Sequence, residues 1–241
     1  IDMEGDLFFF KSDSDSDSDA GNPPSEEERI QRKTGFPLGQ GVYGFHLEDE
    51  NAKINLNAFK DTDREILSTL LLESGVTDPQ QRDTVIDSLL DWKDEEDDDQ
   101  DHRINGAESD YYETLNPPYQ AKNGKFDSIE EMLLLKDMSK YPEILYGSPG
   151  RNPSLAGGDA AVPLKGYMGI HRYLTVVGAK NGKININTAS RTVLRAVGLT
   201  DDYVNRVLDD RSQKPFNSMP PWLPLPLRKN LNVITPVYFT V

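Results

Sequence analysis

The hydrophobic and polar positions of this chain follow two periods, one typical of β-strands and one typical of α-helices. From Gly41 to Glu50 apolar and polar side chains alternate, which predicts a half-buried strand. Asn51 and Ala52 then provide a turn before Lys53–Leu56, so we expect a β-hairpin in this region. Between residues 58 and 146 the apolar positions recur three and four residues apart, which predicts helices.

Three helical segments between residues 58 and 146 carry recognisable end signals. The first can begin at Asp61 or Thr62 and ends at Gly75. The second opens with Asp78-Pro79, an N-cap followed by proline at the first helical position. The third follows a capping box at residues 128–131. The residues predicted to face the core are Ile66, Leu67, Leu70, Leu71, Val85, Ile86, Leu89, Leu90, Trp92, Met132, Leu133, Leu134 and Leu135.

The second half of the chain is expected to mix loops, short strands and two more helices. In chain order we predict a long loop at 147–170, a strand at 173–177, a hairpin turn at 181–182, helices at 189–197 and 201–210, a proline-rich loop at 215–230 and a final strand at 237–241. The two helices are expected to bury Val193, Leu194, Val197, Leu199, Val204, Val207 and Leu208.

One five-residue segment occurs twice. Lys53–Asn57 and Lys183–Asn187 differ only at their fourth position, and each leads into a helical segment. We interpret the two copies as the starts of two related helical units. Asn57 and Asn187, close to the predicted helix starts, are candidate caps.

The chain is strongly acidic. Its 241 residues carry a formal net charge of −15, with a pI of about 4.6, so its field repels nucleic-acid phosphates and anionic lipids. It has no cysteine, which excludes disulfides and thiolate chemistry. Residues 12–19 alternate Ser and Asp, which favours a solvated loop over the alternative, a cation-binding tract. The chain begins at Ile1, and we expect a preceding N-terminal segment to have been removed.

An acidic loop is the candidate metal site. Ten acidic residues lie between Asp91 and Asp110, and residues 97–108 follow the ligand order of an EF-hand calcium loop. The predicted ligands are Asp97, Asp99, Asp101, the backbone carbonyl of Arg103, and Glu108. His102 replaces the glycine that permits the sharp turn of an EF-hand, so we expect a calcium site with a structural role and not a true EF-hand. The alternative is a solvated acidic loop.

Sequence motifs for catalysis are missing. No G-x-S-x-G, H-E-x-x-H, P-loop or G-x-G-x-x-G pattern occurs, and the three histidines fall on different predicted elements. We therefore predict that the chain is not an enzyme. A calcium-dependent hydrolase is the weakest of the alternatives.

Two family resemblances follow from these motifs. Ile184–Ala189 with the helices after it resembles helix-hairpin-helix modules, but Asp201 and Asp202 stand where such modules contact phosphate. A longer ordered series resembles general secretion pathway protein K, a minor pseudopilin family of type II secretion systems. The matching segments are 54–57, 89–92, 105–108, 111–112, 117–119, 122–124, 126–131, 173–175 and 184–189.

The resemblance to protein K implies a fold, a location and partners. The fold would be α+β, a pilin-like antiparallel sheet with a truncated N-terminal helix and a large inserted helical domain containing helix-hairpin-helix or SAM-like units. Residues 1–57 and 215–241 would form the pilin-like part and residues 58–214, with the metal loop 91–110, the insertion. The missing helix would anchor the protein in the bacterial inner membrane, with the present part in the periplasm.

The same resemblance implies a function in assembly. The protein would sit at the tip of the pseudopilus, bind the I and J minor pseudopilins, initiate or cap the filament, and face the outer-membrane secretin or an exported substrate. Calcium would bind in the insertion. Asn105, Glu108 and Asp110 lie in the segment that matches the family, and Asp110 is therefore a further predicted ligand. The alternative is a helix-hairpin-helix protein that binds nucleic acid, which the acidic hairpin disfavours.

Overall fold

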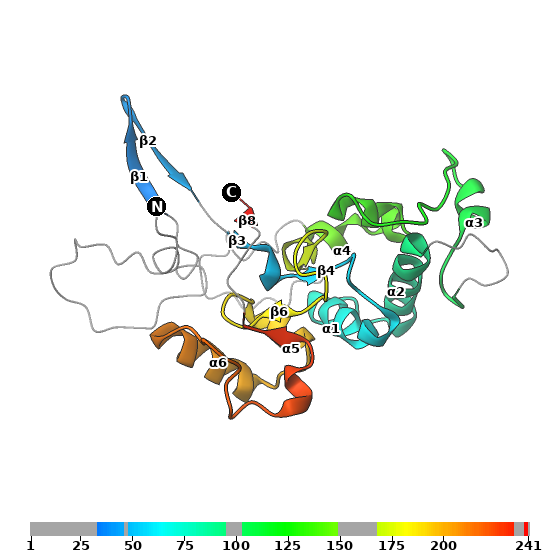
Figure 1. The fold of residues 1–241 in the computed structure, drawn as a ribbon. Coiled ribbons are helices and arrows are strands. Elements are labelled where there is room, and N and C mark those ends of the chain that lie inside the picture. Colours follow the sequence, from blue (N-terminus) through cyan, green and yellow to red (C-terminus); the bar gives the residue numbers. More distant parts are fainter. Residues whose placement is uncertain (1–32, 46–47, 95–102, 149–167, 234–238, 241) are drawn as a thin grey trace. The chain divides into compact units, whose positions relative to one another are not determined.

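The computed structural model describes residues 33–45, 48–94, 103–148, 168–233 and 239–240, and the chain divides between residues 46 and 47 into two compact units. The first unit contains an antiparallel hairpin of β1 (Lys33–Leu38) and β2 (Gly41–Phe45) (Figure 1). The hairpin predicted between residues 41–50 and 53–56 is therefore wrong, because β2 pairs with the strand before it. The Ser-Asp alternation at 12–19 lies outside the described residues.

The second unit begins with the predicted helical pair. A 3₁₀ turn, η2 (Asp61–Asp63), leads into α1 (Arg64–Ser74), and α2 (Pro79–Lys93) follows. Gly75 ends α1 with φ of 110°, and the Asp78 carboxylate accepts a hydrogen bond from Gln80 N at 3.0 Å. Both predicted end signals are confirmed.

The elements after α2 are short. They are α3 (Ser109–Glu113), η3 (Ile129–Leu134), η4 (Met138–Lys140) and α4 (Pro142–Tyr146). The capping box of Ser128 and Glu131 is present, but it opens a 3₁₀ helix. With three residues per turn, Met132 and Leu135 share the inward side while Leu134 is 42% exposed. The prediction that Leu134 lies in the core is wrong.

The remaining strands are only two residues long and pair between distant segments. β3 (Glu48–Asp49) pairs antiparallel with β8 (Phe239–Thr240), and two parallel pairs join β4 (Ile54–Asn55) to β5 (Leu174–Thr175) and β6 (Ile184–Asn185) to β7 (Leu231–Asn232). The turn predicted at 181–182 exists, with Gly182 at φ of 69°, but β5 and β6 do not pair with each other. The mixture of helices and small sheets agrees with the predicted α+β class.

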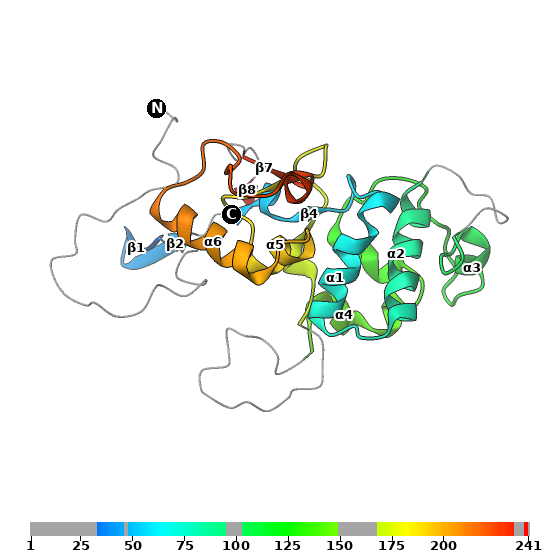
Figure 2. The same cartoon turned by 90° about the horizontal axis from the view of Figure 1, so that it is seen from below.

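Two helical hairpins form the core of this unit. α5 (Arg191–Ala196) and α6 (Asp201–Gln213) lie within two to three residues of their predicted bounds, and α1 packs against both α2 and α5 (Figures 1 and 2). Short 3₁₀ helices also occur as η1 (Glu50–Ala52), η6 (His171–Tyr173) and η7 (Leu225–Arg228). Of the predicted core residues, Ile66 and Leu133 are partly buried, and all the others except Leu134 are buried. The predicted domain boundaries at 57/58 and 214/215 stay predictions.

The repeated pentapeptide forms the same structure twice. In each copy the first asparagine accepts a hydrogen bond from the backbone N–H of the second, at 3.0 Å for Asn55 and 3.2 Å for Asn185. The second asparagine then binds both backbone groups of a distant phenylalanine. Asn57 accepts from Phe126 N at 2.8 Å and donates to Phe126 O at 2.9 Å; Asn187 makes the same pair with Phe216 at 2.8 and 3.0 Å.

Asn57 and Asn187 are thus clamps between distant loops and not helix caps. The cap of α5 is Ser190, whose hydroxyl accepts from Val193 N. A second repeat in the sequence marks the clamped segments, namely Phe126-Asp127-Ser128 and Phe216-Asn217-Ser218. It could have predicted which segments the asparagines bind.

No helix among the described residues has both the length and the apolar character needed to cross a membrane.

Replacement of Asn57 by alanine should lower the free energy of unfolding by about 2–3 kcal/mol. The change removes three side-chain hydrogen bonds, to Phe126 N, Phe126 O and Val176 O, and leaves part-buried backbone groups without their partner. Urea denaturation measures the difference. The matched control is Asn181→Ala, which removes one exposed hydrogen bond to Lys183 N and should change stability by less than about 0.5 kcal/mol. Equal stabilities of the two variants would contradict the clamp.

Candidate metal centre

The candidate site begins with an aspartate on the inward side of a helix. Asp91 lies in the last turn of α2, within the run Leu89-Leu90-Asp91-Trp92, and is fully buried. Asp87, four residues earlier, lies on the same side of the helix and is 4% exposed. A buried carboxylate is costly unless it is paired, so α2 must find partners for two of them.

Three carboxylates meet at the end of α2. Ligand oxygens from Asp91, Asp94 and Glu108 all lie within 4.8 Å of one another. Glu108 reaches this position because it is the residue before α3, where its carbonyl accepts from Tyr111 N and Tyr112 N. The rings of Trp92 on α2 and Tyr112 on α3 meet edge to face at 5.3 Å and hold the two helices together. In both views α3 lies on the side of α2 away from α1 (Figures 1 and 2).

Arg103 supplies a positive charge to this cluster. Its Nη1 donates to Asp91 Oδ1 at 2.5 Å and to Asp94 Oδ2 at 3.0 Å, and its backbone N–H also donates to Asp91 Oδ1, at 3.4 Å. Among the described residues, the three carboxylates of this cluster therefore outnumber the one guanidinium that binds two of them.

The turn at residues 103–106 is fixed to α2 at several points. Asn105 donates from its backbone N–H and from Nδ2 to Asp87 Oδ2, at 3.2 and 2.9 Å. Gly106 N donates to Arg103 O at 2.9 Å and Gly106 O accepts from Lys136 Nζ at 3.0 Å. Position 106 requires glycine, because the Cβ of any other residue would lie 1.7 Å from Asp91 Oδ2.

Two aspartate oxygens of the cluster are buried without a hydrogen-bond partner among the described residues. Among the described residues, Oδ2 of Asp91 and Oδ1 of Asp94 are buried and accept no hydrogen bond. Burial raises the pKa of the Asp91 carboxyl, although Arg103 acts in the opposite direction. The folded chain therefore holds the Asp91 proton more tightly than the unfolded chain, so ionisation of Asp91 as the pH rises lowers the free energy of unfolding. A bound cation would reverse that loss.

The structure brings together only part of the predicted ligand set. Glu108 lies in the cluster, whereas Asp110 is exposed in the first turn of α3 and accepts a hydrogen bond from Tyr111 N. Arg103 contributes its guanidinium to the cluster, and its carbonyl accepts from Gly106 N. The predicted ligands Asp97, Asp99 and Asp101 lie outside the described residues.

Sequence reasoning missed Asp91 and Asp94 as members of the site. The signal was present in the helical phase: Asp91 occupies an inward position of a helix whose other inward residues are apolar. A carboxylate at such a position indicates a partner or an ion.

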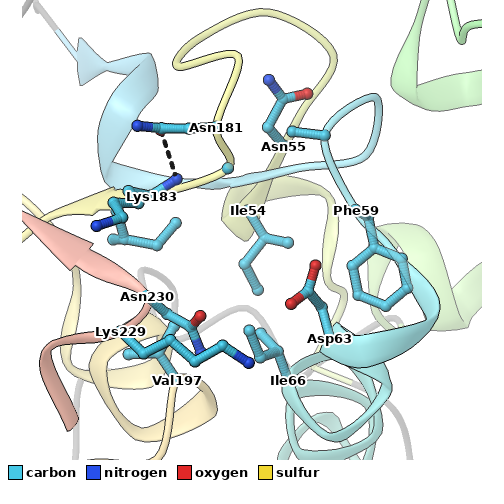
Figure 3. A pocket seen from close by; sticks show the side chains of 13 residues that line it. Ile54, Asn55, Phe59, Asp63, Ile66, Asn181, Lys183, Val197, Lys229 and Asn230 are labelled. Atoms are coloured by element: carbon cyan, nitrogen blue, oxygen red, sulfur yellow. Dashed lines mark hydrogen bonds between the residues drawn. The ribbon is translucent and has the colours of Figure 1, made fainter. Parts of the chain in front are cut away.

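A cavity between the two copies of the repeat offers no comparable chemistry. It is lined by residues of both copies, including Ile54, Asp63, Lys183, Val197 and Lys229 (Figure 3). Its volume of about 50 Å³ is far below the roughly 300–1,000 Å³ of small-molecule sites. Water fits this cavity, and a substrate of ordinary size does not.

Two comparisons with known proteins found similar proteins. Residues 52–142 match the family model described as type II secretion system protein K. A chain in the crystal structure of the GspK–GspI–GspJ complex from the enterotoxigenic Escherichia coli type 2 secretion system is similar in fold, with a TM-score of 0.50 and 20% sequence identity. The similarity covers 78% of this chain and 57% of that chain. No curated protein matches the chain.

Replacement of Gly106 by alanine should lower the free energy of unfolding by about 1–3 kcal/mol, because the new methyl group would displace the buried Asp91 carboxylate. The control is Gly124→Ala, where the nearest atom is 3.7 Å from the added carbon and stability should change by less than about 0.5 kcal/mol. Thermal and urea unfolding measure both. A Gly106→Ala protein as stable as the control would contradict the contact between residues 91 and 106.

Proposed function

Because residues 52–142 match the family model of type II secretion system protein K, we propose that this chain is a minor pseudopilin that acts in assembly and catalyses no reaction. The family match is the observation that carries the proposal, and the similar fold of a chain in the GspK–GspI–GspJ complex supports it. The proposed partners are the I and J minor pseudopilins of the same secretion system.

The strand pairing supports an inserted helical domain. β3 and β8 pair antiparallel although they lie at residues 48–49 and 239–240, so the helices and the two parallel strand pairs lie between neighbouring strands of one sheet. We propose that this sheet is the edge of a pilin-like domain and that the two helical hairpins are the helix-hairpin-helix or SAM-like units of the insertion. The insertion gives the subunit bulk, which suits a position at the tip of a filament, where no further subunit stacks above it.

The proposed location follows from the same family. A pseudopilin is anchored in the bacterial inner membrane by an N-terminal helix, and the described part would lie in the periplasm. There it could face the secretin or an exported protein.

The nucleic-acid alternative gains no support. The hairpin that would contact phosphate carries Asp201, whose carboxylate is bound by Arg195 Nη1 at 2.9 Å. The guanidinium of Arg195 is therefore already paired with a carboxylate. The first turn of α6 carries a second aspartate, Asp202. Phosphate would meet negative charge at this helix start.

We also propose that calcium binds at the cluster of Asp91, Asp94 and Glu108. The fit rests on the two buried oxygens that lack partners among the described residues and on the all-oxygen donor set, which hard cations such as calcium prefer. Asp97, Asp99 and Asp101 follow Asp94 closely in the sequence and are candidates for further ligands. The ion would supply positive charge that ties the end of α2 to the start of α3, which is a structural role.

Calcium should raise the melting temperature of the chain, and EDTA should lower it again. At a free calcium concentration about 100 times the dissociation constant, the ion adds about 2.7 kcal/mol to the free energy of unfolding. Asp91→Asn should abolish this effect because it removes a ligand charge, whereas Asp110→Asn, at an exposed position outside the cluster, should keep it. A melting temperature that calcium does not change in the unsubstituted chain would contradict the proposed site.

Mixing the chain with purified I and J minor pseudopilins should give a complex of one copy of each. Size-exclusion chromatography with light scattering at about 10 µM protein measures its mass, and a gel-shift assay with duplex DNA under the same buffer is the control for the alternative. Absence of any complex together with salt-sensitive DNA binding would overturn the assembly proposal.

A further inference from the structure

Each of the two aspartates in the cluster accepts a hydrogen bond from Arg103 with only one of its carboxylate oxygens. Arg103 Nη1 binds Oδ1 of Asp91 and Oδ2 of Asp94. The oxygens that lack partners among the described residues are the opposite ones, Oδ2 of Asp91 and Oδ1 of Asp94. The guanidinium and a cation therefore need not compete for the same atoms.

We propose that Arg103 is the positioning residue of the calcium site. It fixes the rotation of both carboxylates by holding one oxygen of each, so that their other oxygens are available to the ion. This inference rests on the proposed calcium site and adds a role for a cationic side chain inside it.

Three contacts make Arg103 suitable for this role. Its backbone N–H and its Nη1 both donate to Asp91 Oδ1, so one residue determines the orientation of the buried carboxylate from two directions. Its carbonyl accepts from Gly106 N, which fixes the turn that carries it. The neighbouring Asn105 binds Asp87 one helical turn earlier on α2, so the turn cannot slide along the helix.

The charge balance also favours coexistence over competition. Without Arg103 the three carboxylates would carry three negative charges in a mostly buried place. With Arg103 in position one of these charges is offset, while Oδ2 of Asp91 and Oδ1 of Asp94 keep no hydrogen-bond partner among the described residues. Outer partners that orient metal-binding carboxylates commonly change metal affinity by about 10–100-fold when they are removed.

The test compares calcium binding to three variants by isothermal titration with calcium chloride. Arg103→Met should bind calcium about 10–100-fold more weakly. Arg103→Lys, which keeps the charge and one donor nitrogen, should recover part of the affinity. Arg195→Met is the matched control, because Arg195 also bridges two carboxylates, Glu73 and Asp201, on a different part of the surface, and its loss should leave the affinity unchanged.

A second measurement needs no substitution. Nitrogen–proton NMR spectra of the arginine side chains should retain a protected Arg103 guanidinium signal when calcium is saturating, assigned by its absence in Arg103→Lys. This result separates positioning from competition between the guanidinium and the ion.

Four outcomes would overturn the inference. Unchanged affinity in Arg103→Met would show that the side chain does not position the ligands. Tighter binding, or loss of the protected Arg103 signal on calcium addition, would show that the guanidinium competes with the ion. Absence of calcium binding by the unsubstituted chain would overturn the calcium site itself. This outcome is distinguishable from failure of the Arg103 proposal alone, because it needs no substitution.

Discussion

The side-chain amides of Asn57 and Asn187 are the contacts on which the two helical units depend. Each asparagine binds both backbone groups of a phenylalanine that is distant in the chain, and Asn57 also donates to Val176 O. Apolar burial gives most of the stability. The amide clamps add a constraint on register, because a shifted register would leave part-buried N–H and C=O groups without partners.

The two copies of the unit show where the acidic loop belongs. In the second copy α6 ends at Gln213 and the clamped Phe216 follows almost at once; in the first copy α2 ends at Lys93 and the clamped residue is Phe126. The acidic loop and α3 therefore occupy an insertion in the first copy.

Local signals in the sequence predicted local structure well. Gly75, Asp78-Pro79 and the Ser128 capping box act within a few residues, and the structure confirms all three. Strand partners were not predictable this way, because pairs such as Ile54 with Leu174 and Ile184 with Leu231 join distant segments through only two residues each. In the candidate site, ligand spacing predicted Glu108, which lies in the cluster. Asp91 could have been predicted only from its position on the buried side of α2. The resemblance of ordered motifs to protein K predicted the family that residues 52–142 match.

In the proposed calcium site, a cation completes the surroundings of the buried Asp91 carboxylate. A crystal structure of the chain grown with calcium, and then with a lanthanide in its place, tests this most directly. We expect anomalous density bounded by Asp91, Asp94 and Glu108, with Arg103 still bound to Asp91 Oδ1 and Asp94 Oδ2. Well-ordered carboxylates with no density between them at saturating ion, or density elsewhere on the acidic surface, would contradict it.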